Sequence, residues 1–472
     1  MKLKIVETCL RMWPQWAACM TVTLLSVSFG LVIGWTSPYT ALLTSGEAPV
    51  QITEDQASWV VSLLPFGRLF GAIAGSLAME YYGSKRSVLV SGIPVIIGWV
   101  CIIFANSPTW LYISRICSGV SFGMFYSCFS IYFGEIASPN IRGALVSIVI
   151  NGMPFGTLIG NIIGSRMSMM NFGLISLALS ICYMAIFPLL PHSPYYHVRC
   201  NNPIEAKRTI MWYNRRANVN EELEMIENFV RASTCKTFSE KLAQVLERKN
   251  RRMFTIVILM FIFMQLSGLN TVTFYMEIIV RKAKVTSVEP STVVIISNSF
   301  GIAVGWISVY LIDRCGRKVL LMVSCLCVII AMVLLGLHFM LLNHDFNPEN
   351  LEWLPILAMM LFMLMSIGLI PVPSTLLSEL SPDDLKSIVG FTASVTSALF
   401  SFISSRTYQP LVDLMSEEYV FWMYAIIMTG AMICLGIILP ETKGKTLQEI
   451  QEMLAKHSQR EERTTEVART QR

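Results

Sequence analysis

Twelve apolar runs, each long enough to cross a bilayer, limit most strongly what this chain can fold into. A helix needs about 20 apolar residues to span the hydrocarbon core, and no water is available there to bond its backbone. The 472 residues are 54% hydrophobic and only 14% charged, which excludes an ordinary soluble domain. The sequence therefore predicts an all-α integral membrane protein, with spans at 17–41, 57–80, 87–105, 109–133, 143–165, 172–190, 253–277, 291–312, 319–342, 354–379, 388–412 and 420–439.

Basic residues in the short loops predict how these spans are oriented. With both termini in the cytoplasm, the inner loops contain Lys85, Arg86, Arg142 and the basic group at 314–318. The outer loops at 42–56, 105–109 and 342–353 then contain no Lys or Arg, as the positive-inside rule requires. One outer loop, 281–284, runs against the rule. The balance predicts a multi-pass protein of the plasma membrane with both ends cytoplasmic.

The chain also repeats its own landmarks. E-Y-Y-G-S-K-R at 80–86 follows the second span, and D-R-C-G-R-K at 313–318 follows the eighth. An acid seven residues before a base recurs after the fourth span (Glu135 and Arg142) and after the tenth (Glu379 and Lys386), and a proline-led turn ends the sixth and twelfth. The paired landmarks lie between 233 and 249 residues apart. This near-constant offset predicts two six-helix repeats at 17–190 and 253–439, with cytoplasmic segments at 1–16, 191–252 and 440–472.

The central segment 191–252 has Lys or Arg at twelve positions and amphipathic stretches at 204–213, 221–230 and 238–246. These features predict short helices on the inner membrane face. The charged tail from 456 onward is predicted to be disordered. The net charge of +5 is concentrated in these two segments. It suits a surface near anionic lipid and gives no reason to expect a nucleic-acid partner.

One span carries an unusual set of polar side chains. The apolar run 253–276 contains Gln265, Ser267, Asn270 and Thr273. Amides in hydrocarbon are costly unless they are bonded, so this helix should face other helices or a wet cavity. Gly268 beside Ser267 predicts a kink that lets amides five residues apart serve one site. Alternatively, the amides only hold helices together.

The motif Q-L-S-G-L-N at 265–270 resembles the seventh helix of sugar porters in the major facilitator superfamily. The segments 313–318 and 440–446 (P-E-T-K-G-K-T) resemble the family's D-R-x-G-R-[RK] and P-E-T-K-G-[KR]-[ST]. The first copies are altered. Glu80 and Ser84 replace an Asp and an Arg, and 191–195 reads P-H-S-P-Y where the family has P-E-S-P-R. The resemblance covers nearly the whole chain.

This resemblance implies a sugar site whose pattern is partly lost. Met264 replaces a first Gln, Ser374 replaces the Trp after the P-x-P hinge, and Ser397 with Ala398 replaces an Asn-Trp pair. The substrate-binding residues it implies are Gln265, Asn270, Thr273, Tyr275, Asn151 and Ser374.

An inner gate is also implied, in which acids and bases at the membrane edge lock neighbouring helices. The alternative is that these charges only reflect topology. The implied gate residues are Glu80, Lys85, Arg86, Glu135, Arg142, Asp313, Arg314, Arg317, Lys318, Glu379, Lys386 and Glu441.

Two arginines lie within predicted spans. Arg115, with Gly119 behind it, resembles the family's G-R-x-x-x-G. Arg68 lies mid-span, one turn from Gly71. A cavity role and a pair with a carboxylate both remain open for Arg68.

The first span indicates the type of transport. Proton-coupled sugar porters have an Asp after Gly-Tyr, whereas this chain reads Gly34-Trp35-Thr36 and has no acid from 17 to 41. A membrane acid is needed to carry a proton, so we expect a uniporter. S-P-Y-T at 37–40 and E-D-Q-A-S-W at 54–59 look closest to insect carriers of trehalose.

We therefore expect a monomeric, lipid-embedded facilitative carrier of a sugar, trehalose or a hexose, working by alternating access without a cofactor. Alternatives are a non-transporting sugar sensor of the same fold and a carrier of a polyol or other small solute. No nucleophile–base pair or metal-ligand spacing points to an enzyme or a metal site.

Overall fold

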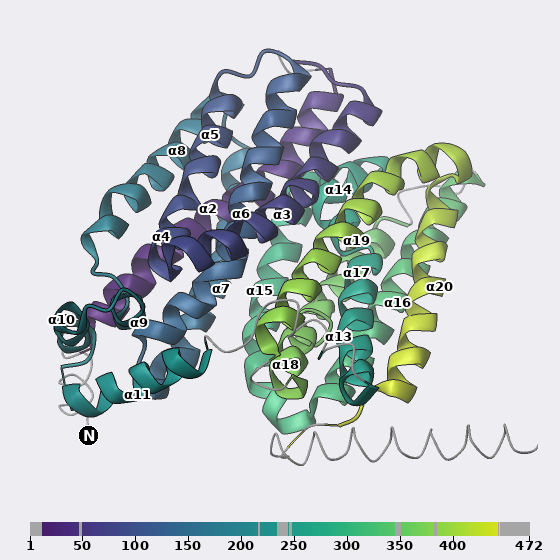
Figure 1. Cartoon of the computed structure of the whole chain (residues 1–472). Helices are drawn as coiled ribbons and strands as arrows, with labels where there is room; N and C mark the ends of the chain where they lie inside the picture. Colours follow the sequence, from purple (N-terminus) through teal and green to yellow (C-terminus); the bar gives the residue numbers. More distant parts are fainter. Residues whose placement is uncertain are drawn as a thin grey trace, which may run out of the picture. The chain divides into compact units, whose positions relative to one another are not determined.

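A computed structural model describes residues 12–46, 50–215, 218–233, 244, 248–344, 351–381, 385–441 and 443. In these residues the chain forms helices and no strand (Figure 1). Twelve helical segments are long and apolar enough to cross a membrane, and they coincide with the twelve predicted spans. The prediction of an all-α, multi-pass membrane protein is confirmed.

The chain divides into two compact units. The first comprises residues up to 236 with 274–278, and the second comprises 237–273 and the residues from 279 onward. The first contains α2 (Trp13–Thr44), α3 (Glu54–Tyr82), α4 (Ser84–Val90), α5 (Gly92–Ile103), α6 (Pro108–Ile136), α7 (Pro139–Gly164), α8 (Met169–Ile186), the 3-10 turn η1 (Phe187–Leu189), α9 (Pro194–Arg199), α10 (Pro203–Tyr213) and α11 (Val219–Ser233).

The second unit is built from α13 (Arg248–Leu266), α14 (Leu269–Lys282, apart from 274–278), α15 (Pro290–Cys315), α16 (Arg317–Asn343), α17 (Trp353–Met363), η3 (Leu364–Ile367), α18 (Pro371–Leu380), α19 (Lys386–Met415) and α20 (Glu417–Ile438).

Glycines allow the helices of the first unit to approach closely. A Cβ on Gly71 of α3 would lie 2.1 Å from the Val120 carbonyl oxygen of α6. A Cβ on Gly34 of α2 would lie 2.9 Å from Cα of Gly160 in α7. Side chains at these positions would push the backbones apart. Small residues at such contacts are a common way to pack membrane helices, where water provides no hydrophobic drive.

The seventh span is broken where the sequence predicts a kink. Helix α13 ends at Leu266 and α14 begins at Leu269. Between them Gly268 has φ 83° and ψ 9°, the left-handed region that glycine enters without steric cost. The kink prediction is confirmed, and the break places Gln265 and Asn270 on opposite sides of one bend.

Three short helices, α9, α10 and α11, follow the last membrane-spanning helix of the first unit. The predicted stretches 204–213 and 221–230 lie in α10 and α11, whereas the stretch 238–246 and the tail after 443 fall mainly outside the described residues. Ala206, Ile210, Leu223 and Ile226 form a small core between α10 and α11. The buried Gln15 amide of α2 donates to the Tyr213 carbonyl oxygen at 2.9 Å, which attaches these short helices to the membrane helices (Figure 1).

Candidate solute site and inner gate

The second unit joins three polar side chains into one hydrogen-bonded chain. Asn270 Nδ2 donates to Gln265 Oε1 at 2.7 Å, and Gln265 Nε2 donates to Ser397 Oγ at 2.8 Å. The bend at Gly268 allows the first contact, and helix α19 supplies the serine. The predicted pair Gln265 and Asn270 is thus brought together. Ser397 is a partner that sequence reasoning missed, because it stands where the resemblance implied a lost contact.

The other predicted binding residues have no described hydrogen bond to Gln265, Asn270 or Ser397. Thr273, one turn after Asn270, is partly exposed, whereas Tyr275 is only 2% exposed. Ser374 is exposed on α18. Asn151, in the first unit, donates from its side chain to the Ser147 carbonyl oxygen of its own helix at 2.8 Å. Their role in binding remains a prediction.

Polar contacts hold the C-terminal end of α14 and the loop that follows it. The Glu352 carboxylate accepts hydrogen bonds from the backbone N–H groups of Thr286 at 2.7 Å and Ser287 at 3.0 Å. Hydrogen bonds from the Ser287 and Thr286 hydroxyls, followed by the backbone donors, lower the pKa of Glu352 to about 2. Lys282 at the end of α14 forms an ion pair of 3.2 Å with Glu417 of α20. The half-helix carrying Asn270 is therefore anchored beyond the bend.

The gate motif of the second unit combines the Arg317–Glu379 ion pair with hydrogen bonds to the Glu441 carboxylate. Gly316, at φ 95°, lets the chain turn sharply into α16. The Glu441 carboxylate accepts hydrogen bonds from the backbone N–H groups of Arg317 and Lys318, both at 3.2 Å. The Arg317 guanidinium donates twice to Glu379 Oε1, at 3.1 and 2.9 Å. Charge-assisted bonds of this kind are stronger than neutral ones, so α16 is bonded to α18 and to the segment after α20.

Three other gate residues of this unit can be placed only in part. The Arg314 guanidinium lies 4.6 Å from the Tyr310 ring centroid, and its backbone oxygen accepts from Lys443 Nζ at 2.6 Å. The side chains of Asp313 and Lys386 lie outside the described residues. Their predicted part in the gate remains a prediction.

The glycine of the first unit's gate motif has backbone angles close to those of Gly316, but its surroundings differ chemically. Gly83 has φ 79° and ψ 167°, close to the φ 95° and ψ 154° of Gly316. A Cβ on Gly83 would meet the Tyr196 ring, whereas a Cβ on Gly316 would meet the Glu441 carboxylate. At this turn an aromatic ring therefore occupies the place that the acid takes in the second unit.

Side chains around Gly83 bond without a described ion pair. The Ser84 hydroxyl donates to the Glu135 carboxylate, and Lys85 Nζ donates to the carbonyl oxygens of Pro188, at 3.1 Å, and Leu190. The Arg86 guanidinium lies 5.4 Å from the Tyr196 ring centroid. Glu80 is exposed, and Arg142 donates to the Ala137 carbonyl oxygen at 3.4 Å.

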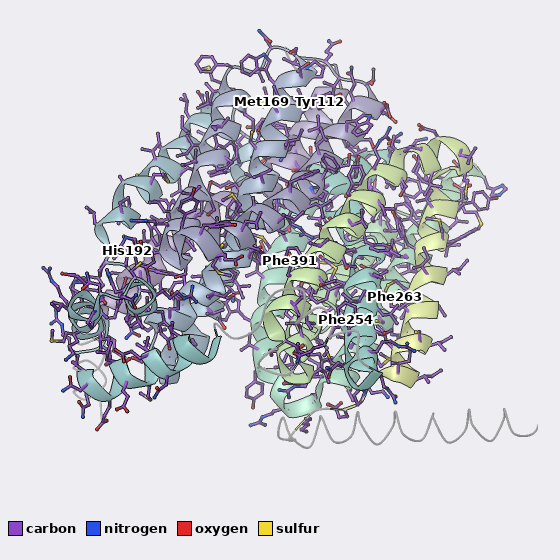
Figure 2. All side chains as sticks on the ribbon, in the orientation of Figure 1. Tyr112, Met169, His192, Phe254, Phe263 and Phe391 are labelled. Carbon is purple, nitrogen blue, oxygen red and sulfur yellow. The ribbon has the colours of Figure 1, made fainter. Side chains whose placement is uncertain are left out.

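His192 replaces the family's glutamate in this motif. Its ring stacks on the Tyr196 ring of α9, and the two ring centroids are 4.8 Å apart. His192 lies just before the start of α9 (Figure 2). Burial, and after it the nearby cations Lys85 and Arg86, together lower the pKa of His192 to about 4. The imidazole is therefore neutral at cytoplasmic pH, and it does not replace the missing carboxylate electrostatically.

Comparisons with known proteins decide the family. The model of the "Sugar (and other) transporter" family matches residues 18–454. The chain belongs to this family. The facilitated trehalose transporter Tret1 of Bombyx mori is 30% identical over 451 residues, which are 95% of this chain and 88% of that protein. Tret1 of Drosophila pseudoobscura pseudoobscura is 28% identical over 93% of this chain, which spans only 51% of that relative's length.

Solved structures show the fold of this sugar transporter. The inward-open xylose transporter XylE from E. coli aligns with a TM-score of 0.77 and 18% identity, covering 93% of this chain and 99% of XylE. The proton:xylose symporter XylE bound to 6-bromo-6-deoxy-D-glucose aligns with a TM-score of 0.74 and 19% identity over 94% of this chain and all of XylE. The expected major facilitator fold is confirmed. The curated relatives are transport proteins, in agreement with the expectation that the chain is not an enzyme.

Within this sugar transporter the two membrane arginines contact aromatic rings. Arg115, only 1% exposed, donates to the Val32 carbonyl oxygen at 2.9 Å, and its guanidinium lies 4.1 Å from the Trp35 ring centroid. The Thr36 hydroxyl donates to the same carbonyl oxygen at 3.1 Å. The Arg68 guanidinium lies 5.7 Å from the Phe122 ring centroid. Cation–π contacts of this kind partly offset the loss of water around a buried guanidinium.

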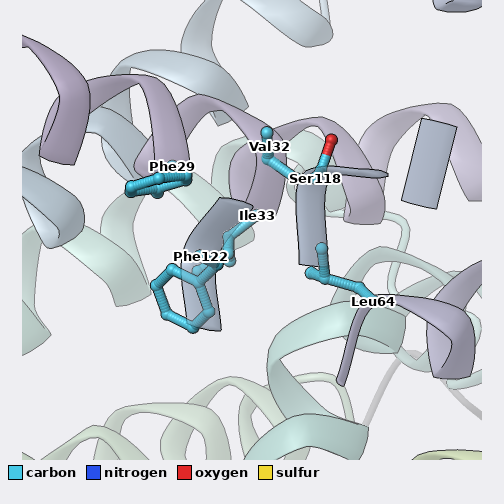
Figure 3. A pocket seen from close by; sticks show the side chains of 6 residues that line it. All are labelled: Phe29, Val32, Ile33, Leu64, Ser118 and Phe122. Atoms are coloured by element: carbon cyan, nitrogen blue, oxygen red, sulfur yellow. The ribbon is translucent and has the colours of Figure 1, made fainter. Parts of the chain in front are cut away.

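A small apolar cavity lies between helices α2, α3 and α6 (Figure 3). Its volume is about 10 Å³, room for about one water molecule and too little for a sugar. No binding residue predicted from the sequence lines it. The lining residues are Phe29, Val32, Ile33, Leu64, Ser118 and Phe122.

Proposed function

We propose that this protein is a facilitative, proton-independent carrier of a sugar, with trehalose as the first candidate and hexoses as the next. It works as a monomer by alternating access, in the plasma membrane, with both termini cytoplasmic. Family membership and the trehalose-transporting relatives support the substrate class. The observation that carries the proposal is the bonded chain of Gln265, Asn270 and Ser397 across the break in the seventh span. Amides held in this way suit solute hydroxyl groups.

The first span supports uncoupled transport. Helix α2 contains no acid, and Thr36 occupies the position at which coupled relatives have a carboxylate. Thr36 is 1% exposed and its hydroxyl donates to the Val32 carbonyl oxygen of its own helix. Because a threonine hydroxyl does not ionise at physiological pH, it cannot take the place of a proton-carrying carboxylate. Glu277 of α14, which sequence reasoning missed, is a carboxylate that is only 4% exposed. It is the residue to test first if coupling is found.

Uptake of radiolabelled trehalose, glucose, fructose and polyols in oocytes expressing the full chain tests the proposal. Saturable trehalose or hexose uptake that equilibrates without accumulation is the expected result. Uptake of polyols alone would replace the sugar assignment by a different solute.

The second candidate is a non-transporting sugar sensor. The altered gate of the first unit favours it, because His192 stands there in the place of a carboxylate. Among the described residues of that gate no ion pair is seen. Saturable sugar binding to the purified chain without any flux would support the sensor and contradict the carrier.

A further inference from the structure

Arg68 is a membrane charge to which the proposed function gives no role. It is the middle residue of α3 (Glu54–Tyr82), with roughly 20 Å of helix on either side. A guanidinium at that depth is too far from either membrane surface to reach bulk water. Charged side chains inside membrane spans usually mark the path of a solute or an ion. We therefore looked for what this charge could bind.

The side chains around Arg68 come from several helices. Its guanidinium lies 5.7 Å from the Phe122 ring centroid of α6, and it interacts electrostatically with the Tyr126 phenol one turn further on. The Phe122 ring packs edge-on against Phe29 of α2, with centroids 5.4 Å apart, and the Tyr126 hydroxyl donates to Met153 Sδ of α7 at 3.8 Å. Because this cluster joins α2, α3, α6 and α7, the guanidinium points into the unit rather than toward lipid.

The backbone at Arg68 is packed tightly against α6. A Cβ on Gly119 would lie 3.0 Å from the Arg68 backbone nitrogen, and a Cβ on Gly123 would lie 2.3 Å from its backbone oxygen. These contacts fix the place from which the side chain starts. Arg68, Phe122 and Tyr126 are nevertheless each partly exposed. A fixed base with an accessible tip suits a binding residue, because little freedom is lost when a ligand arrives.

The four helices give this region a positive charge. Their acids lie only at helix ends, namely Glu54, Asp55, Glu80 and Glu135. Glu277 of α14 donates its backbone N–H to the Ser37 hydroxyl of α2 at 3.1 Å, about 12 Å along that helix from Phe29. A cation in a low-dielectric site attracts an anion strongly, and the guanidinium fork matches the paired oxygens of a carboxylate or a phosphate.

We propose that Arg68, with the Tyr126 hydroxyl beside it, forms a subsite for the anionic substituent of an acidic sugar. The transporter then accepts sugars that carry a carboxylate or a phosphate, in addition to neutral sugars. The guanidinium donates to two anionic oxygens of the substituent. The proposal rests on the proposed sugar transport and deepens it, because it adds a class of substrate.

Competition between sugars that share one ring tests the subsite. Glucuronate differs from glucose only at its last carbon, where it carries a carboxylate that is ionised at neutral pH. We expect unlabelled glucuronate or glucose 6-phosphate to inhibit uptake of labelled glucose or trehalose in oocytes at least as strongly as unlabelled glucose does. The stronger inhibitor of the two identifies the substituent. If neither compound inhibits uptake of the neutral sugar, the proposal is overturned.

Variants of Arg68 separate a binding role from a structural one. Arg68→Gln should raise the inhibition constant of the anionic sugar roughly 10- to 100-fold, because a hydrogen bond to a charged group is lost. KM for the neutral sugar should change less than about threefold. Arg68→Lys keeps the charge without the fork, and its inhibition constant should lie between those of the native protein and Arg68→Gln. Arg166→Gln is the matched control, because it removes the same charge from an exposed position after α7, and it should change neither constant.

The ratio of the two constants does not depend on how much protein reaches the surface, so a folding defect cannot imitate the expected result. Equal increases of both constants in Arg68→Gln and Arg68→Lys would assign Arg68 a structural role and overturn the proposal. Wild-type protein that moves neutral sugar but ignores both anions would also overturn it, and would leave the proposed function intact. Wild-type protein that neither binds nor moves any sugar would instead contradict the proposed function itself.

Discussion

At the scale of single residues, recognition in this protein depends on a few amide atoms in an otherwise apolar helix. Asn270 keeps an oxygen and an N–H free of described partners, whereas the equally polar Gln265 spends both ends of its amide on protein. Two residues of the same chemistry thus differ in how many of their polar atoms the protein itself bonds.

Asn270→Ala should raise the half-saturation constant for sugar uptake by about tenfold or abolish uptake, because lost hydrogen bonds and a stranded buried group together cost roughly 1–3 kcal/mol. Uptake at graded sugar concentrations, normalised to surface expression, measures this. Asn298→Ala is the control, because the Asn298 side chain donates to the Val294 carbonyl oxygen of its own helix at 2.9 Å. Equal effects of the two changes would argue against a solute at Asn270.

At the scale of elements, the protein uses glycine to break or turn helices where function needs it. Gly268 separates α13 from α14, and Gly83 and Gly316 turn the chain at equivalent places in the two units. These bends are local, but the side chains around them come from distant elements and differ between the units.

Gly268→Ala should destabilise the protein by about 1–2 kcal/mol, because a residue with a Cβ is strained in the left-handed region. The added Cβ would also lie 2.9 Å from Met332 Cε, although a methionine end can move aside. Thermal unfolding of the purified chain measures the loss. Gly305→Ala, where a Cβ meets nothing within 4 Å, should be neutral, and a similar loss in both would contradict the strain argument.

The contact of His192 with Tyr196 near the turn at Gly83 should be sensitive to acid. The folded chain holds the pKa of His192 near 4, below its ordinary 6.5, so the unfolded chain binds the proton more readily. Stability should therefore fall as pH drops from about 6.5 toward 4. His192→Gln should remove this part of the pH dependence in melting temperatures measured at pH 7.5 and pH 5. Identical slopes in both proteins would show that His192 does not titrate in this way.

At the scale of the whole molecule, the two units share a similar glycine turn but carry different gate chemistry. The second unit uses the Arg317–Glu379 pair and the Glu441 carboxylate, whereas the first uses hydroxyl, carbonyl and aromatic contacts. The balance between the two states of a carrier is therefore expected to depend more on the charges of the second unit.

Arg317→Lys should shift the carrier toward its inward-open state and reduce flux several-fold with surface expression intact. The reason is that lysine cannot reproduce the two hydrogen bonds that the Arg317 guanidinium donates to Glu379. A pair of this kind contributes up to about 1 kcal/mol, enough to change the populations of a balanced two-state system. Exchange rates normalised to surface expression measure the effect. Unchanged flux in both Arg317→Lys and Glu379→Gln would leave only a topological role for these charges.

Sugar addition should drive no inward current and should not acidify the cell, because α2 has no acid to carry a proton. Current and intracellular pH recorded during sugar addition to expressing oocytes test this. If coupling appears, Glu277→Gln identifies whether the buried carboxylate of α14 carries the proton.

The sequence by itself determined the twelve spans, the repeat and the break at Gly268, because hydropathy, helix length and glycine conformation are local properties. It also singled out Gln265 and Asn270, because amides are rare in an apolar run. Only the tertiary structure decided that Gln265 bonds to Ser397, and that Tyr196 and His192 lie at the turn of Gly83, where the other unit has Glu441. These pairings depend on how helices far apart in the sequence pack, and no local pattern specifies which side chains then come within hydrogen-bond distance.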